Sequence, residues 1–235
     1  MSWPTILVVV LSLLGSVWSE KLPFDEVAPF AEEKNTTSIQ NFLALKFKPQ
    51  LHISFGCYPY PAVDAKGNTN AGLGVTKIFS SCGGSPLGSQ VYGRIVEHNG
   101  FIGIMYAWYL PKAFTISPLW IDPNWMHAIV WINSLNEDSE LLSVTLTSLV
   151  GYSTYSPPTD DQMDGSHVKL KYRWLHQTPH YLTLTDKAGT YQNLIMWDDM
   201  TQAAREAFEH TTFSGSEAPI SPKKFERYIK QAYPF

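Results

Sequence analysis

The sequence predicts a mainly β fold, a single-domain β-sandwich with a few flanking helices. Several short segments alternate apolar and polar residues with a period of two, which is typical of strands. The pair Asn99-Gly100 separates two of these segments, and Asn-Gly is the favoured dipeptide of a type I′ hairpin turn. Helical patterns occur only late in the chain. Many short strands with few helices indicate a sandwich, and 235 residues that are 44% hydrophobic can bury one substantial core.

The two segments around the Asn-Gly turn are the first expected strands. In Phe101–Leu110, alternate apolar residues from Ile102 to Leu110 share one face, while Phe101, Met105 and Tyr109 share the other. A strand that is apolar on both faces is a central strand buried on both sides. The expected strands, in chain order, are Gln90–His98, Phe101–Leu110, His127–Asn133, Leu142–Ser148, His167–Trp174 and Tyr181–Thr185.

Two of these strands carry titratable residues. His127 begins an apolar strand, and we interpret it as a satisfied interior or edge histidine rather than a catalytic one. The strand His167–Trp174 alternates most regularly. Its polar face is either a solvated sheet face or a surface for an anionic ligand, and the pattern favours the solvated face. The residues of that face are His167, Lys169, Lys171 and Arg173.

Two helices are expected near the end of the chain. The first has Asp198-Asp199 in its first turn, followed by an alanine-rich stretch over 200–208. The second begins with Ser221 as N-cap and Pro222 as the first helical residue. Its inward residues are Phe225, Tyr228, Ile229 and Ala232. Between the strands, Asp122-Pro123-Asn124 is interpreted as a turn, since all three residue types favour turns.

The net charge and the N-terminal residues indicate which partners and which localisation to expect. A net charge of -4 argues against nucleic acid as a partner, because proteins that bind nucleic acid need a basic face. Residues 1–19 are interpreted as a signal peptide, because they contain an apolar h-region over 6–14 and end in Val17-Trp18-Ser19, which suits the cleavage site. The alternative, a membrane anchor, is less favoured because the apolar run is shorter than the ~20 residues of a membrane span. We therefore expect a secreted, extracellular domain over 20–235, monomeric, with an N-glycosylation sequon at Asn35.

Two cysteines in a secreted chain predict one disulfide, between Cys57 and Cys82. The alternative is two unrelated free thiols. The bridge closes a loop between residues that are 25 apart, and a cross-link of that size contributes roughly 3–4 kcal/mol in the chain-entropy description.

The segment Gly103–Lys112, GIMYAWYLPK, resembles a segment of the necrosis- and ethylene-inducing peptide-like proteins of plant-associated microbes. In that family it usually reads AIMYSWYFPK, so seven of ten residues match. The resemblance continues in further blocks of the chain, in the same order. These are Phe47–Ser54, Gly56–Ala65, Gly88–Arg94, Met163–Val168 and Leu194–Asp199. It implies a central sandwich like those of actinoporins and fungal lectins.

The resemblance also implies a hard-cation site, which this chain has lost. In cytotoxic members the segment is followed by GHRHDWE, and here residues 120–126 read WIDPNWM. The positions of the four implied ligands hold residues that cannot replace charged oxygen donors. They are Ala113, Ile121, Asn124 and Met126. We expect no metal and no other cofactor, although a shifted loop using Asp122 would leave one carboxylate. Many relatives carry a histidine-glycine-glycine element at Ser148–Tyr152, where Val150 removes a further polar group.

The resemblance therefore implies a secreted effector-like protein of a plant pathogen, acting in the host apoplast without lysing cells. Binding to plant membrane sphingolipids is not expected, because in relatives the ion assists it. In the family the retained segment is read by a plant pattern-recognition receptor. The residues retained for it are Ile104, Met105, Tyr106, Trp108, Tyr109, Pro111 and Lys112.

Three other functions remain open. The loop Trp120–Trp125 could form an aromatic platform for a glycan or lipid, or cytolysis could be retained by a different site. A hydrolase is the weakest alternative, because the sequence has no nucleophile elbow and no HExxH, so no catalytic residue is expected.

Overall fold

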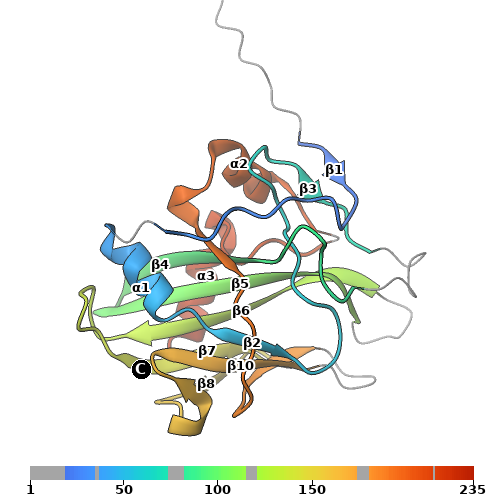
Figure 1. Cartoon of the computed structure of the whole chain (residues 1–235). Coiled ribbons are helices and arrows are strands. Elements are labelled where there is room, and N and C mark those ends of the chain that lie inside the picture. Colours follow the sequence, from blue (N-terminus) through green and yellow to red (C-terminus); the bar gives the residue numbers. More distant parts are fainter. Residues whose placement is uncertain (1–18, 35–36, 74–81, 115–120, 174–179, 214) are drawn as a thin grey trace, which may run out of the picture.

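The computed structural model describes residues 19–34, 37–73, 82–114, 121–173, 180–213 and 215–235. Its largest element is a six-stranded sheet in the order β12-β4-β5-β6-β7-β8 (Figure 1). The strands are β4 (Gln90–His98), β5 (Phe101–Phe114), β6 (Ile121–Ile132), β7 (Leu141–Thr147), β8 (Tyr152–Tyr155) and β12 (Asn193–Met196).

A four-stranded sheet lies over one face of the larger sheet. Its order is β11-β10-β2, with β9 paired to β10. The strands are β2 (Gln50–Ile53), β9 (Met163–Asp164), β10 (His167–Arg173) and β11 (Tyr181–Leu184). A short parallel pair joins β1 (Lys21–Leu22) to β3 (Thr69–Asn70).

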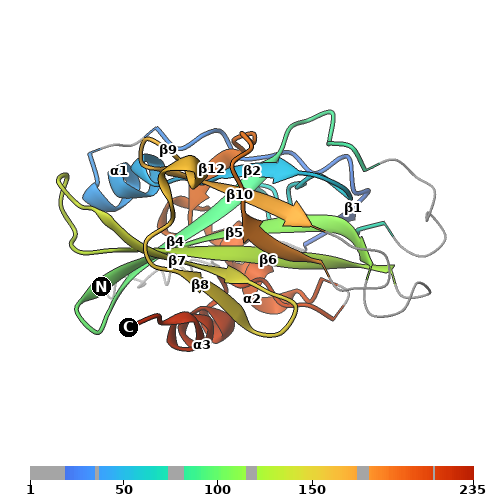
Figure 2. The same ribbon diagram turned by 90° about the horizontal axis from the view of Figure 1, so that it is seen from below.

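Three helices complete the layers. Helix α1 (Ile39–Lys46) lies on the side of the smaller sheet, while α2 (Gln202–His210) and α3 (Pro222–Ala232) cover the other face of the six-stranded sheet (Figure 2). Short 3-10 turns occur at Asp160–Gln162 and Trp197–Asp199. Among the described residues, no helix is long and apolar enough to cross a membrane.

The six-stranded sheet has a core on each face, and β5 contributes to both. Ile104, Tyr106 and Trp108 face the sandwich core between the sheets. Met105 and Tyr109 face a second core, closed by α2 and α3. All five side chains are at most 1% exposed, and each fully buried large apolar side chain contributes roughly 1.5–3 kcal/mol. The prediction of a central strand buried on both sides is confirmed.

The Asn-Gly hairpin is also confirmed. Asn99 and Gly100 have φ values of 51° and 82°, and a type I′ turn needs positive φ at both central residues. The turn aligns β4 and β5 so that His98 pairs with Phe101 and Tyr92 with Ala107. Strand β4 has the predicted bounds, and β10 ends at Arg173 because Trp174 lies outside the described residues.

The predicted turn at Asp122-Pro123-Asn124 is wrong, because these residues belong to β6. Asn124 pairs with Leu110 and Asp122 with Ala113, so Pro123 stands opposite Pro111 and Lys112 at a register shift. A bulge of this kind tolerates proline, which cannot donate a ladder hydrogen bond. Asp, Pro and Asn therefore occur here in an irregular part of a strand pair and not in a turn.

The predicted start of the first late helix is also wrong. Asp198 and Asp199 lie in the 3-10 turn, and α2 begins at Gln202. Thr201 is the N-cap, because its hydroxyl accepts a hydrogen bond from the Ala204 N–H. For α3, the N-cap position of Ser221, the proline at the helix start and the buried residues Phe225, Ile229 and Ala232 are as predicted.

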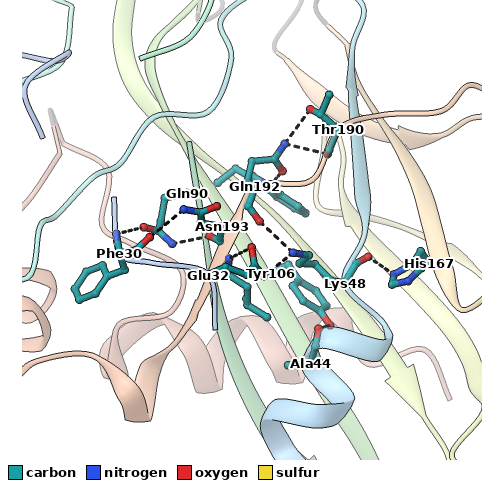
Figure 3. Close-up of polar contacts among 12 residues, drawn as sticks. Phe30, Glu32, Ala44, Lys48, Gln90, Tyr106, His167, Thr190, Gln192 and Asn193 are labelled. Carbon is teal, nitrogen blue, oxygen red and sulfur yellow. Dashed lines mark hydrogen bonds and ion pairs between the residues drawn. The ribbon is translucent and has the colours of Figure 1, made fainter. Parts of the chain in front are cut away.

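A polar network fixes the N-terminal segment 27–33 beside β12, the edge strand of the six-stranded sheet (Figure 3). Lys48 Nζ lies 2.6 Å from Glu32 Oε1 and also donates to the Gln192 carbonyl oxygen. The Phe30 N–H donates to Gln90 Oε1 at 2.6 Å. Trp108 Nε1, inside the sandwich core, donates to Gln192 Oε1 at 2.8 Å. Because Trp108, Gln90 and Gln192 are buried, the network satisfies donors and acceptors that would otherwise oppose folding.

Candidate functional site

A cavity opens at the end of the six-stranded sheet where β6 runs on beyond β7. Strand β7 pairs with β6 only from Ala128 onward, so the residues of β6 before it have no backbone-paired partner in β7. The cavity has a volume of about 480 Å³, within the range of small-ligand sites. Its lining residues are Asn124, Trp125, Met126, His127, Thr147, Ser148, Leu149, Gly151, Tyr152, His180, Ser216, Glu217, Pro219, Tyr228 and Gln231.

The four degenerate ligand positions lie at this end of β5 and β6. Phe114 pairs with Ile121, Ala113 with Asp122, and Leu110 with Asn124, so strand pairing brings all four positions into one neighbourhood. Asn124 Oδ1 accepts a hydrogen bond from the Trp125 N–H at 2.7 Å. The Met126 side chain is 6% exposed and belongs to the sandwich core. The side chains of Ala113, Ile121 and Asp122 lie outside the described residues.

Within the described residues, no three His, Cys, Asp or Glu side chains are grouped so as to hold a metal ion. The oxygen best placed to replace a lost ligand, that of Asn124, already accepts a backbone hydrogen bond. A thioether in an apolar core is a soft and neutral group, unsuited to a hard cation.

His127 is a buried titratable group in the cavity wall. It is 4% exposed, its Nε2 lies 2.8 Å from the Tyr152 hydroxyl, and its ring stacks on Tyr228 with centroids 4.9 Å apart. Burial lowers its pKa to about 3, so the imidazole is neutral. This confirms the prediction of a satisfied interior histidine.

The platform predicted for the loop Trp120–Trp125 is wrong for Trp125. That ring is 4% exposed and lies among Tyr92, Tyr109 and Phe213 in the second core. Strand alternation explains this burial, because Trp125 shares the face of His127, Ile129 and Trp131. Trp120 lies outside the described residues.

Exposed apolar residues occur instead in the turn between β7 and β8. Val150 is 90% exposed and Leu149 is 45% exposed, and Leu149 also lines the cavity. The turn closes through Gly151, whose φ is 68° and whose carbonyl oxygen accepts from the Ser148 N–H. The cavity rim is therefore apolar at Leu149.

Sequence reasoning missed the wall that the C-terminal region contributes. Glu217, Tyr228 and Gln231 line the cavity although they are about a hundred residues from β6 in the chain. Lys224 Nζ lies 2.6 Å from Glu217 Oε2, and its hydrogen bond lowers the pKa of the Glu217 carboxyl. No local pattern marks these residues as a site; only α3 packing under the sheet brings them there. The cavity thus combines a carboxylate, hydroxyl and amide groups, and aromatic rings.

The retained segment Gly103–Lys112 is not part of the surface. Its residues from Ile104 to Trp108 are at most 1% exposed, and Lys112 is 8% exposed. Gly103 explains one departure from the usual segment, because a Cβ there would lie 3.0 Å from the Trp131 ring. The predicted disulfide is present between Cys57 and Cys82. Residues 1–18 and Asn35 lie outside the described residues, so the signal peptide and the glycosylation site stay predictions.

Comparison with known proteins extends the resemblance to the whole fold. The chain matches the family described as necrosis inducing protein (NPP1) over residues 41–232. It is 46% identical over 217 residues to NLP effector protein 8 of Plasmopara viticola, covering 92% of this chain and 89% of the relative. It is 41% identical over 233 residues to the necrosis-inducing protein NPP1 of Phytophthora nicotianae, covering 97% of this chain and 98% of the relative.

Solved structures agree. The structure of the non-toxic HaNLP3 protein is 37% identical, with a TM-score of 0.83, and the match covers 90% of this chain and 99% of that one. NLPPya, solved in complex with mannosamine, is 32% identical, with a TM-score of 0.84 and coverage of 91% and 99%; it has also been solved with glucosamine. The mainly β sandwich is thereby confirmed, and the chain belongs to the necrosis-inducing protein (NPP1) family.

Proposed function

We propose that this chain is a secreted, effector-like protein of a plant pathogen that does not lyse plant membranes. The observation that carries the proposal is the state of the four ligand positions. Asn124 directs its amide oxygen to the Trp125 N–H, Met126 is buried in the sandwich core, and Ala113 and Ile121 have no donor atoms. Nothing at these positions can hold the ion that, in cytotoxic relatives, assists docking to sphingolipid head groups.

The names of the relatives support an effector role, and one of the structural relatives is described as non-toxic. The exposed apolar turn at Leu149 and Val150 also supports loss of the old site, since a hard cation is bound through oxygen donors and water.

The decisive experiment measures dye release from vesicles that contain plant glycosylated sphingolipids. The mature chain is added with magnesium or with a chelator, and the Phytophthora nicotianae relative serves as the positive control. We expect no release from this chain in either condition and no heat of magnesium binding by calorimetry. Magnesium-dependent release that Asn124→Ala abolishes would show that a functional ion site persists.

A second candidate function is binding of an amino sugar in the cavity. The observation that favours it is Glu217, a carboxylate in the wall of a cavity that also offers the Tyr228 ring and the Gln231 amide. A protonated amino group would share the Glu217 carboxylate with Lys224, which already lies 2.6 Å from Glu217 Oε2, while a ring face packs on the aromatic side chain. The relative NLPPya has been crystallised with mannosamine and with glucosamine.

Calorimetry with glucosamine tests this second function, and N-acetylglucosamine is the matched neutral ligand. We expect glucosamine alone to bind, and Glu217→Gln to remove the binding. Glu226→Gln, an exposed carboxylate of α3 outside the cavity, is the control variant. Equal binding of the two sugars would contradict a role for the Glu217 charge.

The segment Gly103–Lys112 is the part of the chain through which plant immunity would sense this protein. Seven residues of the usual segment are retained, and recognition of a linear peptide needs no metal. Burial of the segment in β5 supports recognition after proteolysis rather than on the folded surface.

A further inference from the structure

The outer face of the four-stranded sheet gathers positive charge on a protein whose net charge is -4. In β10, Val168, Leu170 and Tyr172 point into the sandwich core. Strand alternation therefore turns Lys169, Lys171 and Arg173 outward, and all three are half-exposed. Helices α2 and α3 lie on the opposite side of the molecule (Figure 2).

Strand register shows which residues flank this row. Lys171 lies between His52 of β2 and Thr183 of β11, and Arg173 lies beside Tyr181 of β11. Gln50 of β2 lies beside Lys169. The outward positions of the three strands thus carry no carboxylate, so the row faces solvent without an internal counter-charge.

The nearest acids lie at the margins of the sheet. Asp164 of β9 pairs in register with His167, and its carboxylate accepts from Gln50 Nε2 at 2.5 Å. Asp186 follows β11, and its backbone carbonyl, not its carboxylate, accepts from Lys169 Nζ. Within the described residues, no carboxylate forms an ion pair with Lys169, Lys171 or Arg173, since the ion pairs found there are Lys48–Glu32 and Lys224–Glu217.

Aromatic rings lie near both ends of the row. Tyr191 is 43% exposed and its ring meets that of His167 edge-on, with centroids 5.3 Å apart. Tyr181 is partly exposed beside Arg173 at the other end. Alternate residues of a strand are roughly 6.5–7 Å apart, so three cations form a straight line of about 13 Å. The outward positions of these strands offer no aliphatic side chain to insert into a bilayer, which interfacial binding requires.

We infer that this face binds a linear anionic polysaccharide whose carboxylates repeat along the chain, a polyuronate. The cations of β10 contact the uronic-acid carboxylates, and Tyr181 and Tyr191, near the two ends of the row, pack against sugar rings. This interaction uses the outer face of the smaller sheet, whereas most of the cavity lining comes from β6, the β7–β8 turn and the C-terminal region, and it needs no metal.

The test is co-sedimentation or calorimetry of the mature protein with polygalacturonate, in a calcium-free buffer so that calcium cannot bridge the polymer. The variant Lys169→Gln/Lys171→Gln/Arg173→Gln should bind at least ten-fold more weakly, and wild-type binding should weaken as salt rises. Fully methyl-esterified pectin, which lacks the charges, should not bind.

The matched control removes two lysines and one arginine from the opposite side of the molecule. Lys223→Gln/Arg227→Gln/Lys230→Gln changes exposed residues of α3 and alters net charge equally. It should bind like the wild type. Thermal unfolding of both variants verifies folding. Equal losses in the two variants, no polygalacturonate binding by the wild type, or β10-dependent binding only to phosphatidylserine vesicles would each overturn the inference.

Discussion

His127 stays neutral because it is buried among aromatic side chains. Its Nε2 shares a hydrogen bond with the Tyr152 hydroxyl, Tyr228 covers its ring, and burial lowers its pKa to about 3. The sequence predicted a buried histidine from an apolar strand, but not these partners, which come from β8 and α3. The possibility that Trp125 forms part of an exposed aromatic platform was also wrong at the scale of the single residue. A tryptophan beside a prolyl segment indicates a loop, whereas register with β5 places it in the second core.

The first prediction concerns the pH dependence of stability. In the unfolded chain His127 regains a pKa near 6.5, so acid favours the unfolded state. The stabilising contribution is complete above pH 6.5 and declines as pH falls from there toward about 3. We expect wild type to lose about 2 kcal/mol more than His127→Gln between pH 8 and pH 5. Urea unfolding at both pH values measures the difference, and parallel losses in the two proteins would contradict it.

At the scale of elements, residues with one clear periodicity were predicted well. Strand β10 alternates strictly, and α3 combines Ser221, Pro222 and a regular apolar stripe, so both were recognised. Helix α1 was missed because its apolar residues, from Ile39 to Leu45, cover several sides and leave no stripe. Strands β2 and β12 were missed because each is short and pairs in parallel with a strand far away in the sequence.

The second prediction concerns the disulfide between Cys57 and Cys82. It closes a loop of 25 residues, so Cys57→Ser/Cys82→Ser should lower the free energy of unfolding by about 3 kcal/mol. Guanidinium unfolding of both proteins, followed by tryptophan fluorescence, provides the values. The dependence of the free energy of unfolding on guanidinium concentration should be steeper in the variant, because an uncrosslinked unfolded chain exposes more surface. A change below about 1 kcal/mol would contradict the prediction and would indicate that the uncrosslinked unfolded chain retains structure in this loop.

For the whole molecule, resemblance predicted the sandwich, which the solved relatives confirm, and the loss of the ion site, which stays a prediction; it did not predict the cavity beside those positions. The cavity depends on α3 and the β7–β8 turn meeting β6, and Glu217 reaches it from a region with no recognisable motif. Contacts between distant segments are not encoded in local periodicity, so this part required the structure.

The third prediction concerns immune recognition of Gly103–Lys112. Because β5 is buried in both cores, its receptor should meet it only after unfolding or proteolysis. Heat-denatured or protease-digested protein should induce early immune signalling in a receptor-bearing plant at least as strongly as folded protein. A synthetic peptide spanning Asn99 to Trp120 should be active, with a scrambled peptide as control. An inert peptide, in a plant that responds to the usual family peptide, would refute this recognition.

The position of β5 also limits how this protein can evolve. A surface epitope can change freely, because most exposed substitutions alter stability by less than about 0.5 kcal/mol. In β5, Tyr106 and Trp108 serve one core and Met105 and Tyr109 the other, so a substitution on either face opens a cavity costing about 2–5 kcal/mol. Much of the usual 5–15 kcal/mol of domain stability would then be lost. Any receptor that reads this strand would therefore read a sequence in which replacing a large side chain by a small one destabilises the fold on either face.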